Sequence, residues 1–197
     1  MNTGKIVLIV IAALILMIGM GAYSSYNSMV ELDEGVGQQW SNVENAYQLR
    51  ADKTKNLVEI VKGAADFEKE TLTGVIEARS NATKVQIDAN DLSAENIQQF
   101  QQAQDKFSSA LSRLLVTVER YPELKAVKGF QDFQAQYEGM ENRIGVERRK
   151  YNESAKFMNT KIKKMPGKIY NMFFGFEEKG YFEAKEGSEE APDISFE

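Results

Sequence analysis

An uncharged apolar run extends from Ile6 to Tyr23, directly after a single lysine, Lys5. Its 18 residues are at the lower end of the length that crosses a hydrocarbon core about 30 Å thick as a helix. Polar residues flank the run at positions 2–4 and 24–27. The sequence therefore predicts a membrane anchor over residues 6–23, preceded by a short flank at residues 1–5, with the lipid bilayer as a partner.

The small residues Gly19, Gly21 and Ala22 would also suit the cleavage site of a secretory signal. The run is longer than the apolar core of such signals, so we expect an uncleaved, single-pass anchor. Lys5 precedes the run, whereas the first basic residue after it is Arg50. The positive-inside rule then predicts a cytoplasmic N-terminus and an extracytoplasmic domain.

The composition excludes several kinds of chemistry. The chain has no cysteine and no histidine, which removes disulfides, the common zinc sites and histidine acid–base catalysis. Carboxylate-bridged metal sites in helical bundles normally use a Glu-x-x-His motif, which this chain cannot form. A net charge of −5 disfavours nucleic acid as a partner. We therefore predict a protein that is not an enzyme, with no catalytic residue, no metal and no cofactor.

Beyond the anchor, apolar residues recur at helical spacing. The first stripe contains Val36, Trp40, Val43, Tyr47, Leu57 and Val61. Arg50 and Thr54 fall in phase with it, so the stripe either faces solvent there or pairs polar groups inside.

Further helical patterns cover residues 67–85, about 93–121, and the stretch from Pro122 to Met165. The first of these is either a separate helix or a continuation of the preceding one, bent near Gly63. No segment alternates like a strand. We predict an all-α fold: a transmembrane helix followed by an antiparallel helical bundle of about four long, coiled-coil-like helices, with its domain at residues 24–165.

Residues 166–197 contain a dense aromatic segment followed by an acidic tail over residues 183–197. The aromatic residues either fold back and cap the bundle or form a membrane-interface or partner-docking segment. The candidate interaction surface consists of Tyr170, Phe173, Phe174, Phe176, Tyr181 and Phe182.

Several short motifs rich in polar residues occur along the chain in a recognisable order: WSNV at residues 40–43, RAD at 50–52, YPELKA at 121–126, ENRI at 141–144 and RRKYN at 148–152. With these motifs the chain resembles the LemA family of small bacterial membrane proteins over nearly its whole length. Where that family usually has apolar residues and a proline, this chain has Lys53, Thr54 and Lys55, so its first helix should run straighter. The resemblance implies a single N-terminal span in the bacterial cell membrane and a long-helix bundle, but no established activity.

The polar residues of these motifs and their neighbours are able to pair between helices and fix the register of the bundle. Alternatively, they form a polar site for a peptide or an anionic ligand. The candidate network consists of Arg50, Asp52, Asn56, Glu119, Glu141, Asn142, Arg143, Arg148 and Asn152.

Long amphipathic helices without catalytic residue types favour a membrane-anchored, non-enzymatic scaffold or protein-interaction module, with a protein partner or self-association. The alternative is an extracytoplasmic ligand-binding or sensing bundle that acts through a partner, which would need a cavity lined by Arg50, Arg143 or Arg148.

Overall fold

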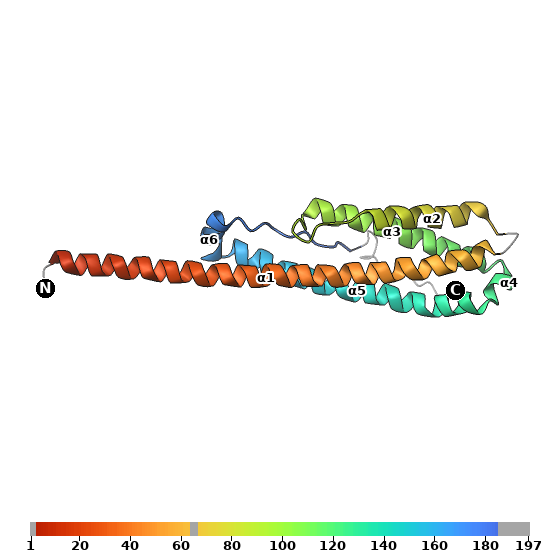
Figure 1. The fold of residues 1–197 in the computed structure, drawn as a ribbon, viewed down its shortest axis with the longest axis horizontal. Coiled ribbons are helices and arrows are strands. Elements are labelled where there is room, and N and C mark those ends of the chain that lie inside the picture. The colour runs from red at the N-terminus through yellow and green to blue at the C-terminus, as the bar shows by residue number, and fades with distance from the viewer. Residues whose placement is uncertain (1–2, 64–66, 185–197) are drawn as a thin grey trace, which may run out of the picture.

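The computed structural model describes residues 3–63 and 67–184 and confirms an all-α fold, with no strand in those two ranges (Figure 1). Its helices are α1 (Thr3–Lys62), α2 (Lys69–Lys84), α3 (Ala94–Val118), α4 (Pro122–Lys125), α5 (Lys128–Lys163) and α6 (Gly167–Phe174). The four longest, α1, α2, α3 and α5, alternate in direction along one axis (Figure 1).

The helix α1 contains both the predicted anchor and the first helix of the bundle. At 1.5 Å per residue, its 60 residues extend for about 90 Å without interruption. The N-terminal third projects beyond the other helices with its side chains exposed, and it is long and apolar enough to cross a membrane (Figure 1). The chain is thus a membrane-associated helical protein.

Heptad spacing determines which side chains of α1 face the bundle. One buried series repeats every seven residues, and a second lies four residues further along each repeat. Polar members of both series, Arg50 and Thr54, are buried, so the polar groups are paired inside the bundle. The first series contains Met29, Val36, Val43, Arg50 and Leu57, and the second contains Trp40, Tyr47, Thr54 and Val61.

The chain turns back after α1, so α2 is a separate helix that packs on α3 and α1. The predicted break at Tyr121 is also present, because α3 ends at Val118 and Pro122 begins the single turn α4. The fourth predicted helix is therefore divided into α4 and the long α5, which lies antiparallel to α1 (Figure 1).

The core has two parts along the bundle axis. The distal part, far from the anchor, is closed by α2 and includes Leu57, Phe107 and Phe130. Because α2 ends at Lys84, it does not reach the part near the anchor. There the core around Trp40 is covered by residues 85–92 and by residues 175–184. We call residues 175–184 the strap. The strap leaves α6 and runs back along the bundle as extended chain (Figure 1).

Candidate functional site along the strap

Side-chain amides on α5 hold the main chain of the strap. The amide of Asn159 donates to the carbonyl of Lys179 at 2.8 Å and accepts from the Lys179 amide at 2.8 Å. Asn152 repeats this pair with Phe182, at 2.8 and 2.9 Å. Each asparagine therefore binds a residue of extended chain as the neighbouring strand of a sheet would.

The spacing of the two asparagines matches the strap. Seven helical residues separate Asn152 from Asn159, a rise of about 10.5 Å. Three residues separate Lys179 from Phe182, which in extended chain is about 10 Å. Positions seven residues apart on α5 therefore lie opposite positions three residues apart on the strap, which runs in the opposite direction.

The helix α3 holds the other side of the strap. Gln101 donates to the carbonyl of Glu183 at 3.1 Å and accepts from its amide at 3.0 Å. The amide of Gly180 donates to the carbonyl of Leu92 at 2.7 Å. A Cβ on Gly180 would lie 2.6 Å from the Cα of Ala94, so only glycine permits this approach.

Two side chains of the strap are buried. Phe182 enters the core against Trp40, Phe100 and Tyr151, whose ring centroids lie 5.4–6.4 Å from its own. Lys179 pairs with Asp33 of α1 at 2.7 Å. Burial in this aromatic cluster raises the pKa of Tyr151 well above its usual range, so its phenol stays neutral.

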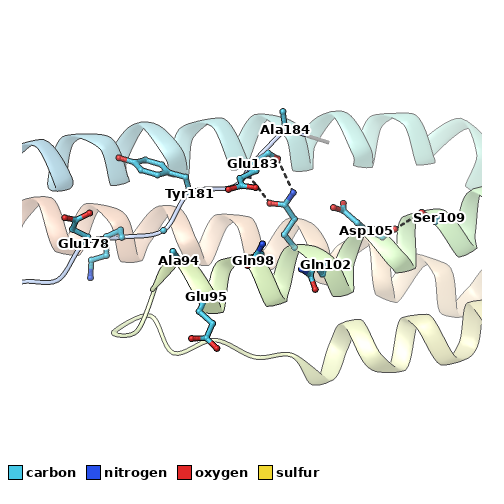
Figure 2. A pocket seen from close by; sticks show the side chains of 13 residues that line it. Ala94, Glu95, Gln98, Gln102, Asp105, Ser109, Glu178, Tyr181, Glu183 and Ala184 are labelled. Atoms are coloured by element: carbon cyan, nitrogen blue, oxygen red, sulfur yellow. Dashed lines mark hydrogen bonds between the residues drawn. The ribbon is translucent and has the colours of Figure 1, made fainter. Parts of the chain in front are cut away.

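A half-open cavity of about 810 Å³ lies between α3 and the outer edge of the strap (Figure 2). Gln98, Gln102 and Asp105 line it from α3, and Tyr181 and Glu183 line it from the strap (Figure 2). Its lining of side-chain amides and carboxylates beside a tyrosine suits a peptide better than a purely apolar ligand.

Two members of the predicted polar network meet at the centre of the bundle. Arg50 of α1 donates to Glu141 of α5 at 2.7 Å, to the side chain of Gln104 at 2.9 Å, and to the hydroxyl of Ser108. The guanidinium also lies over the rings of Tyr47 and Phe107, with its Cζ 5.1 and 4.9 Å from their centroids.

Arg148 and Asn152 contact the strap. Arg148 donates to the carbonyl of Glu183 at 2.8 Å and lies over the ring of Phe182.

The remaining residues of the candidate network are exposed and do not join the cluster around Arg50. Asp52 accepts from Gln48 on its own helix, and Glu119 pairs with Lys125 across the α3–α4 corner. Asp52 lies on α1 outside the two buried heptad series, and Glu119 lies just past the end of α3. The other exposed members are Asn56, Asn142 and Arg143.

The aromatic candidates divide by position. Phe182 is buried, and Tyr26 of α1 lies 5.1 and 5.9 Å from the rings of Phe174 and Phe176. Phe173 is 82% exposed. Tyr170 packs against α1 at Gly21, and the hydroxyl of Tyr181 accepts from Asn159. Residues 185–197 of the predicted acidic tail lie outside the described residues.

Sequence reasoning missed Gln101, Asn159 and Lys179. The available signal was the seven-residue repeat from Asn152 to Asn159 on a helix face next to the apolar one. The partners of Gln101 and Asn159 on the strap are main-chain groups, which any sequence supplies.

Within the described ranges, no three acidic side chains gather in a way that would hold a metal ion. The expectations of no metal, no cofactor and no catalytic residue stay predictions.

Comparison with known proteins covers most of the chain. The sequence model of the LemA family matches residues 39–196. Magnetosome proteins MamQ 1 and MamQ 2 of Paramagnetospirillum magneticum AMB-1 are each 26% identical over 179 residues, covering 81% of this chain and 65% of theirs. Magnetosome protein MamQ of Magnetospirillum gryphiswaldense MSR-1 is 34% identical over 79 residues, 40% of this chain and 29% of that protein. This chain thus spans just under two thirds of the first two relatives.

Proposed function

The chain belongs to the LemA family, and we propose that it is a membrane-anchored, non-enzymatic module that binds protein through the cavity between α3 and the strap. The observation that supports this most directly is the amide ladder. Asn152, Asn159 and Gln101 each bind both main-chain groups of one strap residue. Such contacts recognise extended chain with little dependence on its side chains.

The cavity would extend this recognition to a second extended segment. Tyr181 is exposed at the outer edge of the strap, and Gln98 and Gln102 face the same cavity with amides that both donate and accept (Figure 2). A partner segment laid there would meet amide groups on one side and the strap on the other. The partner is therefore a protein segment in extended conformation.

The rigid bundle would present this site at a set distance from the membrane. The helix α1 passes from the anchor into the bundle without a break, so the domain has no flexible linker at that junction. We propose that the N-terminus is cytoplasmic and the bundle extracytoplasmic, from the position of Lys5. A cysteine introduced by Asn142→Cys should react with an impermeant maleimide in intact cells. If the cysteine at position 142 reacted with the maleimide only after the cells were lysed, the bundle would be cytoplasmic and the proposed orientation would be wrong.

The ligand-sensing alternative has less support from the geometry. Both terminal nitrogens of Arg50 already donate to side chains of the same bundle. Arg148 is engaged by the strap, and Arg143 is exposed on α5. None of the three arginines lines the cavity beside the strap.

Site-specific photocrosslinking in living cells tests the proposal. A photoreactive residue replaces Gln102 in the cavity or, as the matched control, exposed Asn142 on α5. We expect a discrete adduct with another protein from position 102 and none from position 142. An adduct only with a second copy would indicate a homo-oligomeric scaffold. Equal adducts from both positions, or none from position 102, would refute a binding site at the cavity.

A further inference from the structure

The short helix α6 lies beside α1 where the apolar run ends. A Cβ on Gly21 would be only 2.7 Å from the hydroxyl oxygen of Tyr170, so glycine at this position admits the tyrosine. Five residues further along α1, the ring of Tyr26 packs edge-on against Phe174, with the ring centroids 5.1 Å apart. These contacts place α6 beside the end of the apolar run of α1 (Figure 1).

The outer face of α6 is apolar and uncovered. Met172 and Phe173 are 80% and 82% exposed, and Ile169 is 50% exposed. These three follow the spacing i, i+3 and i+4, which forms one helical stripe, and Met165, 68% exposed, lies in the turn just before α6. The opposite face, with Tyr170 and Phe174, packs toward α1. An apolar residue type on both faces suits a helix with protein on one side and lipid on the other.

Basic side chains lie next to this stripe. Lys164 and Lys168 are exposed and have no ion-pair partner in the part of the chain that the structure describes. Lys163 pairs with Glu178 at 2.6 Å. A hollow of about 590 Å³ is lined by Lys163 and Lys168 together with Met172. Ammonium groups beside exposed apolar side chains match an anionic phospholipid, which offers a phosphate above its acyl chains.

We propose that α6 lies in the interface of the bilayer that α1 crosses, with Ile169, Met172 and Phe173 among the acyl chains and Lys164 and Lys168 at anionic headgroups. The continuity between α6 and the apolar run of α1 selects the membrane as the occupant of this face. A single span leaves a domain free to tilt and rotate. A second contact beside it holds the bundle in one orientation to the membrane surface. This contact is independent of the protein-binding cavity.

Fluorescence quenching in vesicles tests the contact on the full chain. Because the chain has no cysteine, Met172→Cys gives a single site for an environment-sensitive fluorophore. Val116→Cys is the matched control, since Val116 is 70% exposed on α3 at the end of the bundle far from the anchor (Figure 1). Unchanged emission of Trp40, which is fully buried, verifies that each variant is folded.

The vesicles contain phosphatidylcholine, about one quarter phosphatidylglycerol, and a lipid with a nitroxide near the glycerol end of its acyl chain. We expect quenching at position 172 to exceed that at position 116 by about threefold or more. It should fall in vesicles without phosphatidylglycerol, and also when Lys164→Gln and Lys168→Gln are combined. The control pair Lys53→Gln and Lys55→Gln, at exposed positions far along α1, should leave it unchanged.

Equal quenching at positions 172 and 116 would overturn the membrane contact. A fluorophore at position 172 that is shielded from water but not quenched, and that becomes exposed when the protein is diluted in lipid, would show that a second copy covers α6. That result would also overturn the proposal. Quenching that does not depend on phosphatidylglycerol or on the two lysines would refute the headgroup contact.

Discussion

Replacing Arg50 tests how the centre of the bundle is held together. Its side chain is 1% exposed, and its terminal nitrogens donate to groups on both α3 and α5. In Arg50→Met the aliphatic stem is kept but these donors are lost. The Gln104 side-chain oxygen and the Ser108 hydroxyl then lose a partner inside the bundle, whereas Glu141, 31% exposed, is able to regain water.

The expected cost follows from those contacts. A hydrogen bond to a charged group contributes about 1.5 to 3 kcal/mol, and a buried polar group left without a partner costs about 1 to 3 kcal/mol. The apolar methionine and the rehydration of Glu141 offset part of this. We expect Arg50→Met to lower the free energy of unfolding by about 3 kcal/mol.

Denaturation of the full chain in mild detergent measures this change. Trp40 is the only tryptophan and is fully buried in the core near the anchor, so its emission reports unfolding of the bundle rather than of the anchor. The matched control is Arg143→Ala on exposed α5, expected within about 0.5 kcal/mol of the parent.

A double-mutant cycle with Glu141→Gln isolates the ion pair from the rest of the cluster. We expect a coupling free energy of about 1 to 2 kcal/mol between positions 50 and 141. If Arg50→Met cost no more than Arg143→Ala, the interior pairing would contribute nothing to stability, and the reasoning from buried hydrogen bonds would be refuted.

Three further changes test the strap and its aromatic cluster. Phe182→Ala should destabilise the bundle by about 3 kcal/mol, because it opens a cavity in the core, whereas Phe173→Ala should have little effect in detergent; equal unfolding midpoints would contradict this. Asn159→Ala should speed amide hydrogen exchange at residues 179–183, while Asn142→Ala should leave it unchanged. If these amides stayed protected from exchange in Asn159→Ala, the side-chain amides of α5 would not be what holds the strap. Tyr151→Phe should reduce the loss of stability that occurs at alkaline pH. The raised pKa keeps the Tyr151 phenol neutral in the folded protein, whereas in the unfolded chain the phenol ionises near pH 10. Above that pH, ionisation therefore favours the unfolded chain, and the variant without the phenol lacks this effect. Measuring the unfolding midpoint as a function of pH checks this. If the midpoints of the two proteins fell equally above about pH 10, the reasoning would be refuted.

The fold was largely predictable because its main elements depend on local patterns. The apolar run predicted the exposed N-terminal part of α1, and the stripe from Val36 to Val61 predicted its buried face. Pro122 predicted the end of α3 because the preceding residue resists the helical conformation. Whether α2 continues α1 or is a separate helix was left open, since an amphipathic pattern continues on both sides of Gly63.

The candidate site was predictable only in part. In-phase Arg50 indicated that a polar group is either paired inside or faces solvent, and the structure decides for pairing with Glu141. Arg143, two residues after Glu141 on α5, was a candidate for the same network and is exposed. The difference is about 200° of rotation around α5, which no composition argument specifies without knowing which face meets α1.

The amino-acid sequence by itself determined the apolar N-terminal run, the helical class and the absence of cysteine and histidine side chains. Each of these depends on residue type and on spacing within a single helix. Only the tertiary structure decided which polar side chains are buried and where the strap and α6 lie. Asn152 and Asn159 bind main-chain groups of a segment about 25 residues away. Because every residue type except proline has the same main-chain donor and acceptor, such partners cannot be identified from the sequence. The position of α6 beside the end of the apolar run of α1 depends likewise on how α5 folds back, which is a property of the packed bundle.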